Sequence, residues 1–470
     1  MEKENAMVDN SIICAIATPS GTGAIAVIRL SGFGCIDLCD RVFRSPSGKC
    51  LAKVEPNTIH FGRIYDGEEL VDEVLVSVFR APHSFTGEDS IEISCHGSVY
   101  IQQRILQLLI YNGARLAEPG EYTRRAFLNG KMDLSQAEAV ADLIASTSSA
   151  AHKMALNQMR GGFSSELIKL RGELLRITSL LELELDFSEE DVEFADRRQL
   201  LDISLGINTL LTRLCNSFSL GNVIKNGVPV AIVGNTNVGK STLLNALLRE
   251  EKAIVSNIEG TTRDVIEDTI NIQGTTFRFI DTAGIRHTTD EVETIGIERT
   301  FSKIAQARIV LLLVDSTKDV EQIVPYYEQV KASLSSDSRL IILLNKIDKI
   351  LDVGDIVTRL RLFSTGEVIL PISAKSGQNI PDLEKYLLDE ILRDDLPVDG
   401  VIVNNIRHYE ALSSARKAIL RVIEGLNSHL SGEFISQDIR ECLHYLGEIT
   451  GVITSDEILG FVFKNFCIGK

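Results

Sequence analysis

Gly234-Asn235-Thr236-Asn237-Val238-Gly239-Lys240-Ser241 is the stretch that decides the fold of this 470-residue chain. An apolar run over 228–233 precedes it, and a helical pattern follows. A buried strand, a glycine turn and a helix start place backbone N–H groups around a phosphate. Lys240 would reach the terminal phosphates of a nucleotide, and Ser241 would ligate Mg²⁺. Because strand and helix patterns alternate over 226–394, we expect a doubly wound sheet around this phosphate loop.

Two motifs downstream complete the phosphate and metal side of the site. Asp281-Thr282-Ala283-Gly284 follows a strand pattern, so Asp281 can hold Mg²⁺ and the Gly284 N–H can approach a γ-phosphate. Gly260-Thr261-Thr262-Arg263-Asp264 lies between the two loops, and Thr262 would bind Mg²⁺ only while a γ-phosphate holds its loop closed.

Two more motifs indicate the base. In Asn345-Lys346-Ile347-Asp348, the Asp348 carboxylate can accept hydrogen bonds from the guanine N1–H and 2-amino group. Adenine offers no matching pair of donors, so GTP is selected over ATP. Lys346 would stack its stem on the base, and the backbone of Ser373-Ala374-Lys375 would meet the guanine O6. These four motifs, together with the phosphate loop, predict a GTP site.

The residue after Gly284 is Ile285, where many small GTPases carry a glutamine that orients the attacking water. An isoleucine side chain cannot orient water, so another group must do so. The nearby candidates are Arg286, His287, Asp290, Glu291 and Glu293. Asn237 is a second candidate, since its amide oxygen could hold a monovalent cation beside the phosphates.

Composition excludes several other classes of protein. The net charge of −17 argues against broad, non-specific nucleic-acid binding. The longest apolar runs, such as 309–314, have the length of a strand, and the N-terminus shows no secretory signal, so we expect a cytoplasmic chain without membrane association. Eight cysteines without a CxxC pair indicate neither a zinc site nor a disulfide framework, and most should be buried.

The patterns predict a multi-domain chain. An α+β domain is expected over 1–125 and an all-α domain over 126–224, continued over 396–470. An α/β P-loop GTPase domain over 225–395 would be inserted into the helical one.

The ordered set G-x-x-N-x-G-K-S, G-T-T-R-D, D-T-A-G-I-R and N-K-x-D resembles the potassium-dependent GTPases of the TrmE–Era–Septin group. Flanking segments narrow the resemblance to the MnmE (TrmE) family of tRNA-modification GTPases, over nearly the whole chain. These segments lie at 17–19, 28–32, 84–89, 96–97, 119–123 and 125–134, and in the terminal Cys467-Ile468-Gly469-Lys470.

The resemblance implies a homodimer that forms a heterotetramer with an MnmG-type flavoprotein. It implies modification of C5 of the wobble uridine of certain tRNAs, with addition of an aminomethyl-type group such as carboxymethylaminomethyl. It also implies 5-formyltetrahydrofolate or a related folate in the N-terminal domain as the source of the one-carbon unit. The implied folate site is Arg29, Glu92, Lys131 and Lys470. The implied K⁺ ligands are Asn237, Ser256, Ile258 and Thr261, and the implied catalytic residue is Glu293.

The expected GTP contacts come from these motifs and from the adjoining residues Thr242 and 256–259. They are Asn237, Val238, Gly239, Lys240, Ser241, Thr242, Ser256, Asn257, Ile258, Glu259, Gly260, Thr261, Thr262, Asp281, Thr282, Ala283, Gly284, Asn345, Lys346, Asp348, Ser373, Ala374 and Lys375. Among them Ser241, Thr262 and Asp281 are the expected Mg²⁺ ligands.

Three alternatives stay open from the residues alone. Arg29 and Glu92 are either folate ligands or ordinary strand residues. Cys467 is either a nucleophile for one-carbon transfer or a packed residue of the tail, since no base partner is visible in the sequence. The chain is either a tRNA-modifying enzyme or a regulatory GTPase that acts as an assembly switch. Neither a G-x-x-G clamp in a KH-like setting nor a basic tail is present to support the switch.

Overall fold

The computed structural model describes residues 11–186, 197–250, 268–280, 304–335, 338–364, 366–392, 401–453, 456–464, 466 and 469. The chain divides into two compact units. The first consists of Met1–Ala145, Ala155–Thr212 and Glu410–Lys470, and the second of Ser146–Met154 and Arg213–Tyr409. The second unit therefore interrupts the first in the sequence. The finer limits expected at residues 125, 224 and 395 stay predictions.

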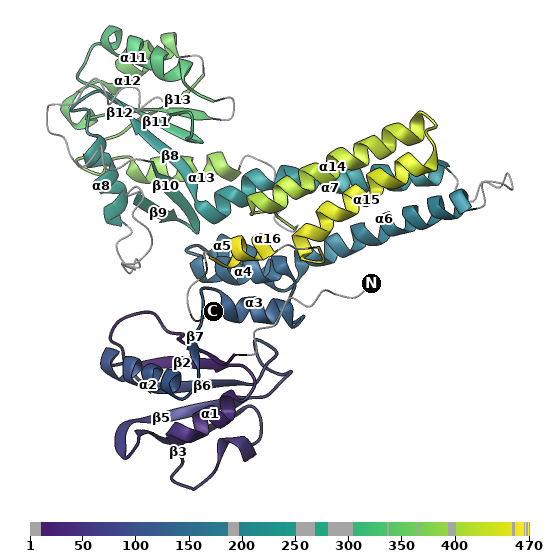
Figure 1. Ribbon diagram of the computed structural model, residues 1–470. Coiled ribbons are helices and arrows are strands. Elements are labelled where there is room, and N and C mark those ends of the chain that lie inside the picture. Colours follow the sequence, from purple (N-terminus) through teal and green to yellow (C-terminus); the bar gives the residue numbers. More distant parts are fainter. Residues whose placement is uncertain are drawn as a thin grey trace. The chain divides into compact units, whose positions relative to one another are not determined.

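The first unit begins with a seven-stranded sheet of order β3-β4-β5-β6-β2-β1-β7 (Figure 1). Neighbouring strands pair antiparallel, except that β1 and β7 pair in parallel. The helices α1 and α2 cover one face, where Cys39 and Leu109 pack with Val76 and Ile93. The elements are β1 (Ile13–Ile16), β2 (Ile25–Ser31), α1 (Cys35–Val42), β3 (Phe43–Arg44), β4 (Thr58–Asp66), β5 (Glu69–Phe79), β6 (Ser90–His96), α2 (Val99–Tyr111) and β7 (Arg115–Leu116).

The other face of this sheet carries exposed apolar side chains. Ile59 and Phe61 on β4 are 66% and 49% exposed, and Leu75 on β5, paired with Phe61, is 47% exposed. Side chains alternate between the faces of a strand, so these residues lie opposite the buried Val74 and Val76. The sheet thus has one buried face and a second, open face, which is exposed over β4 and β5 but covered at β1, where Ile13 and Ala15 are buried with Tyr122.

The rest of the first unit is helical. α6 packs against α15, with the Arg171 guanidinium donating to the carbonyl of Leu443 at 3.3 Å. α4 packs against α16 through Leu134, Ala137 and Phe463. The helices are α3 (Glu121–Leu128), α4 (Leu134–Ala145), α5 (Ser149–Met159), α6 (Gly162–Asp186), α7 (Arg197–Asn226), α14 (Ile406–Asn427), α15 (Gly432–Thr450) and α16 (Asp456–Lys464), of which α5, α7 and α14 each extend into the second unit.

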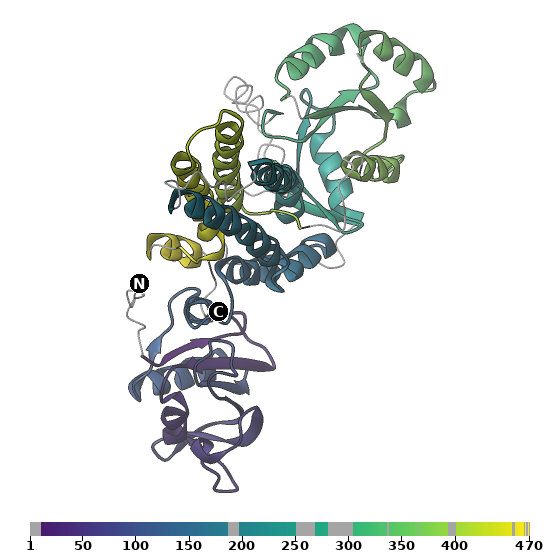
Figure 2. The same ribbon diagram turned by 90° about the vertical axis from the view of Figure 1, so that its right-hand side faces the viewer.

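The second unit is built on a six-stranded sheet of order β13-β12-β11-β8-β10-β9. All its strand pairs are parallel except β9 with β10. Helices α8 and α13 cover one face and α11 and α12 the other (Figures 1 and 2). The elements are β8 (Val228–Val233), α8 (Lys240–Glu250), β9 (Asp268–Ile272), β10 (Thr275–Phe279), β11 (Ile309–Asp315), α11 (Val320–Ala332), β12 (Arg339–Asn345), α12 (Val353–Phe363), β13 (Val368–Pro371) and α13 (Ile380–Leu392).

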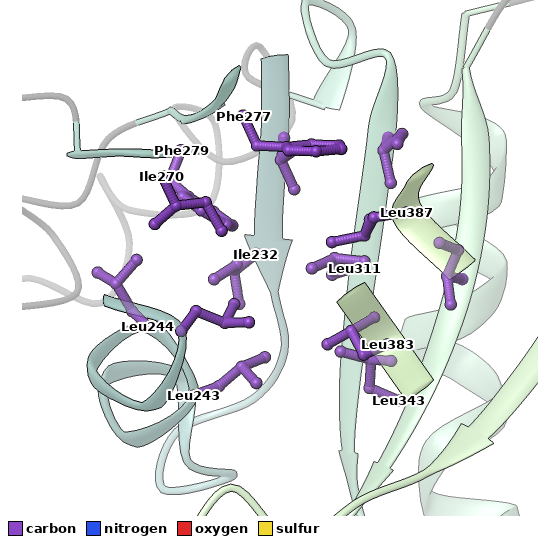
Figure 3. Close-up of a cluster of buried hydrophobic side chains, with 14 of the residues drawn as sticks. Ile232, Leu243, Leu244, Ile270, Phe277, Phe279, Leu311, Leu343, Leu383 and Leu387 are labelled. Carbon is purple, nitrogen blue, oxygen red and sulfur yellow. The ribbon is translucent and has the colours of Figure 1, made fainter. Parts of the chain in front are cut away.

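The core beneath α8 and α13 is continuous and apolar. Leu243 and Leu244 of α8 and Leu383 and Leu387 of α13 lie over the strands, with Phe277 among them (Figure 3). The doubly wound sheet expected from the alternating pattern is therefore confirmed. It fixes the carboxyl ends of β8, β11 and β12 at one edge, where ligands of such sheets bind.

The chain enters and leaves this sheet at neighbouring points. The N–H of Val403 donates to Oγ of Ser217 at 3.0 Å, and the rings of Phe218 and Tyr409 stack with centroids 4.7 Å apart. The segment that returns after α13 therefore lies along the end of α7. This closeness of entry and exit is what an inserted domain requires.

Two sequence expectations have definite outcomes. Among the cysteines that the structure describes, all are buried except Cys50, as expected. No helix in the described ranges is long and apolar enough to cross a membrane.

Candidate functional site

The phosphate loop runs from the end of β8 to the start of α8. Gly239 has a φ of 104°, and a Cβ at this position would lie 2.5 Å from Nδ2 of Asn345. Only glycine adopts this backbone without strain and leaves room for the amide. The loop can therefore lie directly against Asn345, the last residue of β12.

Lys240 is held over its own loop. Its Nζ donates to the carbonyls of Gly234 at 2.6 Å and Asn235 at 3.2 Å. Burial lowers the pKa of this amine from its ordinary value. An ammonium group in this position can exchange its bonds to carbonyls for stronger bonds to phosphate oxygens. Ser241 and Thr242 follow it in the first turn of α8.

The base-reading residues come together at the ends of β12 and β13. Asn345 is buried; its Nδ2 donates to the carbonyl of Val238 at 2.7 Å, and its Oδ1 accepts from the N–H of Ala374 at 3.0 Å. One amide thus joins three of the predicted motifs. It does so from inside the protein, so its role is to align the loops.

Asp348 is exposed, which leaves its carboxylate accessible to a base. Its Oδ1 accepts a hydrogen bond from Oγ of Ser373 at 2.7 Å, and this bond lowers the pKa of the carboxyl group. A carboxylate held charged and oriented in this way has the geometry to accept the two donors of a guanine edge.

Lys346 connects the base side with the phosphate side. Its Nζ donates to the carbonyl of Asn237 at 2.7 Å and to Oδ2 of Asp315 at 2.6 Å. The sequence motifs did not include Asp315. The sequence shows only that Asp315 ends a continuous apolar strand; its place next to β12 comes from the order of strands in the sheet.

Many predicted site residues lie outside the described residues. These are Ser256, Asn257, Ile258, Glu259, Gly260, Thr261, Thr262, Asp281, Thr282, Ala283, Gly284, Glu293, Cys467 and Lys470. The Mg²⁺ and K⁺ ligand sets are therefore represented in the structure by Ser241 and Asn237 alone.

Burial raises the pKa of Cys14 and Cys95 to about 11 and that of Cys442 to about 12, so none of these three is a ready thiolate.

A second polar site lies on the open face of the N-terminal sheet. Arg29 on β2 and Glu92 on β6 are cross-strand neighbours, joined by Nη2–Oε1 at 2.7 Å and Nε–Oε1 at 3.0 Å. The Arg29 guanidinium also lies 3.5 Å from the carbonyl of Gly469, next to the chain end. Lys131 Nζ donates to the carbonyl of Pro82 at 2.9 Å. Three of the four predicted folate residues are thus described, and two of them form an ion pair.

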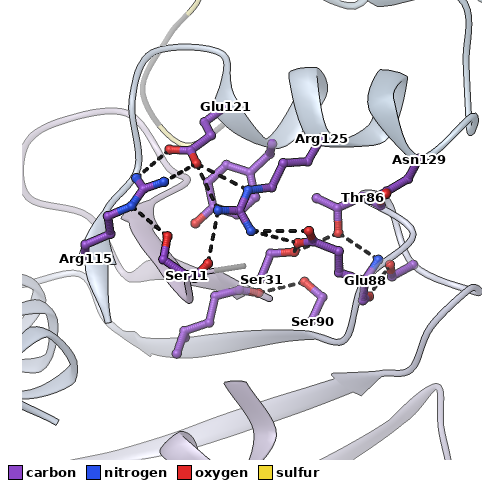
Figure 4. Close-up of polar contacts among 12 residues, drawn as sticks. Ser11, Ser31, Thr86, Glu88, Ser90, Arg115, Glu121, Arg125 and Asn129 are labelled. Carbon is purple, nitrogen blue, oxygen red and sulfur yellow. Dashed lines mark hydrogen bonds and ion pairs between the residues drawn. The ribbon is translucent and has the colours of Figure 1, made fainter. Parts of the chain in front are cut away.

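A buried charge network supports the loop beside this site (Figure 4). Arg125 on α3 donates through Nη1 to both oxygens of Glu88, at 3.2 and 3.1 Å, and through Nη2 to Glu121 and to the Ser11 carbonyl, each at 3.0 Å. Ser31 Oγ donates to Glu88 at 2.8 Å. The network ties α3 to the loop over 82–89, and this loop contacts Lys131. Sequence spacing gave no signal for it.

A phosphate loop after β8 and an asparagine, lysine and aspartate at the end of β12, on a doubly wound sheet, define a P-loop GTPase. The family profile described as "MnmE helical domain" matches residues 134–467, and "GTP-binding protein TrmE N-terminus" matches residues 12–131. The chain belongs to the MnmE family.

The chain is similar to curated members of this family over its full length. The tRNA modification GTPase MnmE of Bacteroides thetaiotaomicron is 57% identical over 464 residues, which cover 97% of this chain and 99% of that protein. That of Parabacteroides distasonis is 56% identical over 463 residues, or 98% and 100% of the two chains. A GTP-binding protein from Sulfolobus solfataricus, solved in complex with GDP, shares 21% identity over 48% of this chain and 67% of its own, at a TM-score of 0.27. That last similarity is too low to support any inference.

Proposed function

We propose that this GTPase acts on tRNA, modifying C5 of the wobble uridine of certain tRNAs together with an MnmG-type flavoprotein. The group added is of the aminomethyl type, such as carboxymethylaminomethyl, with its one-carbon unit drawn from a folate. The observation that carries this proposal is the full-length similarity to curated tRNA modification GTPases. We expect the chain to work in the cytoplasm.

Mass spectrometry of tRNA nucleosides from a deletion strain tests the proposal. Loss of the modified wobble uridine, restored by the intact gene, is the expected result. Full retention of the modified wobble uridine in the deletion strain would instead favour a regulatory GTPase.

We propose that hydrolysis uses Mg²⁺ and K⁺. Ser241, Thr262 and Asp281 would hold Mg²⁺, and the side chain of Asn237 would ligate K⁺ with Ser256, Ile258 and Thr261. In support, Asn237 is exposed at the phosphate loop, and its carbonyl is fixed by Lys346 at 2.7 Å. A cation held there would offset the charge that develops between the phosphates.

GTP turnover is expected to be at least about tenfold faster in potassium than in sodium chloride, because the smaller Na⁺ fits the same ligands less well. Asn237→Gly should abolish the difference. Asn237 has a φ of 59°, and glycine adopts this backbone freely, so only the amide is lost. Turnover measured in both salts checks this. Equal rates for the unaltered chain would rule out the cation site.

We propose Glu293 as the residue that orients the attacking water, since Ile285 cannot. Glu293→Ala should lower kcat by about 10²–10³-fold while GTP affinity is retained. Glu291→Ala, which removes a carboxylate two residues away, is the matched control and should turn over normally. Single-turnover hydrolysis and GTP titration separate the two quantities, and a normal rate for Glu293→Ala would move the role to another side chain.

We propose that the open face of the N-terminal sheet is where two copies of the chain meet and where folate binds. In support, this face exposes Ile59, Phe61 and Leu75 and carries the Arg29–Glu92 pair. Lys131 and Lys470 would receive the anionic tail of the folate. Sedimentation at the monomer mass would contradict the homodimer.

Glu92→Gln is expected to weaken binding of 5-formyltetrahydrofolate by about tenfold or more, because a carboxylate suits the adjacent N–H donors of a pterin better than an amide does. Glu73→Gln is the matched control: it breaks the exposed cross-strand pair Arg63–Glu73, joined at 2.9 Å, on the same sheet. Titration calorimetry with the folate checks both variants. If Glu92→Gln binds as the unaltered chain does, Glu92 is an ordinary strand residue.

A further inference from the structure

Asp315, at the carboxyl end of β11, has a side chain that is almost completely buried, at 9% exposure. Its Oδ1 accepts from the N–H of Thr317 at 3.0 Å and from the hydroxyl of Thr317 at 2.7 Å. Its Oδ2 accepts from Nζ of Lys346 at 2.6 Å. Both oxygens therefore act only as acceptors, in two different directions.

The partner of Asp315 has an unusual backbone. Lys346 has a φ of 67° and a ψ of 32°, in the left-handed region that non-glycine residues seldom occupy. Such conformations persist where the surroundings fix them, and they concentrate at functional sites. Here the surroundings include the two bonds of Nζ, to Asp315 and to the Asn237 carbonyl. The Lys346 ammonium group therefore links the phosphate loop to the segment after β12.

We propose that Asp315 is a positioning residue for nucleotide binding, which acts through Lys346 and does not touch the nucleotide. By fixing Nζ, it sets the course of the Lys346 stem across the place where the base binds. Through the same ammonium group, Asp315 also fixes the carbonyl of Asn237. The phosphate loop is thereby held in a constant position relative to the residues Asn345–Asp348. The affinity for GTP and GDP therefore depends on a carboxylate at the end of β11 that does not contact the nucleotide.

A carboxylate is required at this position. In Asp315→Asn, an amide oxygen turned toward Lys346 would place the NH₂ group against the Thr317 N–H, donor to donor. The opposite orientation would place the NH₂ group against the Lys346 ammonium. Only two acceptor oxygens satisfy both neighbours at once. Asp315→Asn therefore changes the contact with little change in volume.

The test is the rate of release of a fluorescent GDP analogue from the full chain. Asp315→Asn is expected to speed release by about ten- to a hundredfold, which corresponds to the loss of one charge-assisted hydrogen bond. Lys346→Met should have a similar effect, and the double variant should release no faster than the faster single one, because both changes break the same contact. Thr317→Val is the control; it removes a hydroxyl from the other carboxylate oxygen and should change release by less than about threefold.

Two readouts separate positioning from a purely structural role. A positioning role raises KM for GTP in Asp315→Asn with little change in kcat, and it weakens GDP and inosine diphosphate equally, because the Lys346 stem meets the plane of the base and not its edge. Release at the unaltered rate in Asp315→Asn, or effects that multiply in the double variant, would overturn the proposal. Thermal unfolding without nucleotide checks the fold of each variant. Asp315→Ser, which cannot reach Lys346 but can still bond Thr317, replaces Asp315→Asn if that variant does not fold.

Discussion

Asp348→Asn is expected to lower the affinity for GTP by about 10²–10⁴-fold, the loss of two charge-assisted hydrogen bonds. The unaltered carboxylate is exposed, and Ser373 holds it by one oxygen at 2.7 Å. An asparagine there would turn its NH₂ group toward the donors of guanine. Xanthine carries a carbonyl in place of the 2-amino group, so the same asparagine matches it. The variant should therefore bind xanthosine triphosphate more tightly than GTP.

Titration of each variant with GTP, xanthosine triphosphate and ATP measures this change. Asp352→Asn is the matched control, because Asp352 is a nearby exposed aspartate whose Oδ1 accepts from the N–H of Gly354 at 2.9 Å to cap α12. It makes the same change of charge away from the base and should leave all three affinities unaltered. A preference for guanine that survives in Asp348→Asn would remove Asp348 from the base site.

The nucleotide site was accessible to sequence analysis because its residues are local. The phosphate loop directly follows the buried strand β8, and the motif Asn345–Asp348 begins at the last residue of the buried strand β12. An apolar run such as 228–233 is readable without knowledge of its neighbours. Asp315 was missed for the opposite reason. Its role depends on β11 lying beside β12, which brings it to Lys346, 31 positions away in the sequence. The order of strands in a sheet cannot be read from any single segment of the sequence.

The N-terminal site shows the same limit. From the residues alone, Arg29 and Glu92 are two separate positions, each either a folate ligand or an ordinary strand residue. The register of β2 and β6 makes them direct neighbours, so each already compensates the charge of the other. A folate must therefore either displace one partner of the Arg29–Glu92 ion pair or bind to the intact pair. Register follows from the pattern of burial across the whole sheet, which is why single residues did not reveal it.

Arg125→Met is expected to destabilise the first unit by about 3–5 kcal/mol, the usual cost of leaving a buried charge without its partner. Arg125 is 5% exposed, and its partners Glu121 and Glu88 are 6% and 15% exposed. Methionine fills a similar volume but leaves both carboxylates short of donors. At about 2–4 °C per kcal/mol, the corresponding calorimetric transition should fall by about 10 °C. Arg124→Met is the matched control, since Arg124 is 43% exposed and its pair with Glu118 spans 3.7 Å, so the change should cost less than about 1 kcal/mol.

The pH dependence of this loss identifies its cause. Burial acts to raise the pKa of Glu121, but the bonds from Arg115 and the Glu118 N–H, together with the charge of Arg125, outweigh it and lower the pKa below 4.5. A lowered pKa stabilises the fold above the unfolded value and loses that effect as the pH falls through the folded value. The gap in melting temperature between Arg125→Met and the unaltered chain should therefore be widest near neutral pH and narrow below about pH 4.5. A gap that stays constant down to pH 3 would mean that Arg125 stabilises α3 by packing and not by its charge.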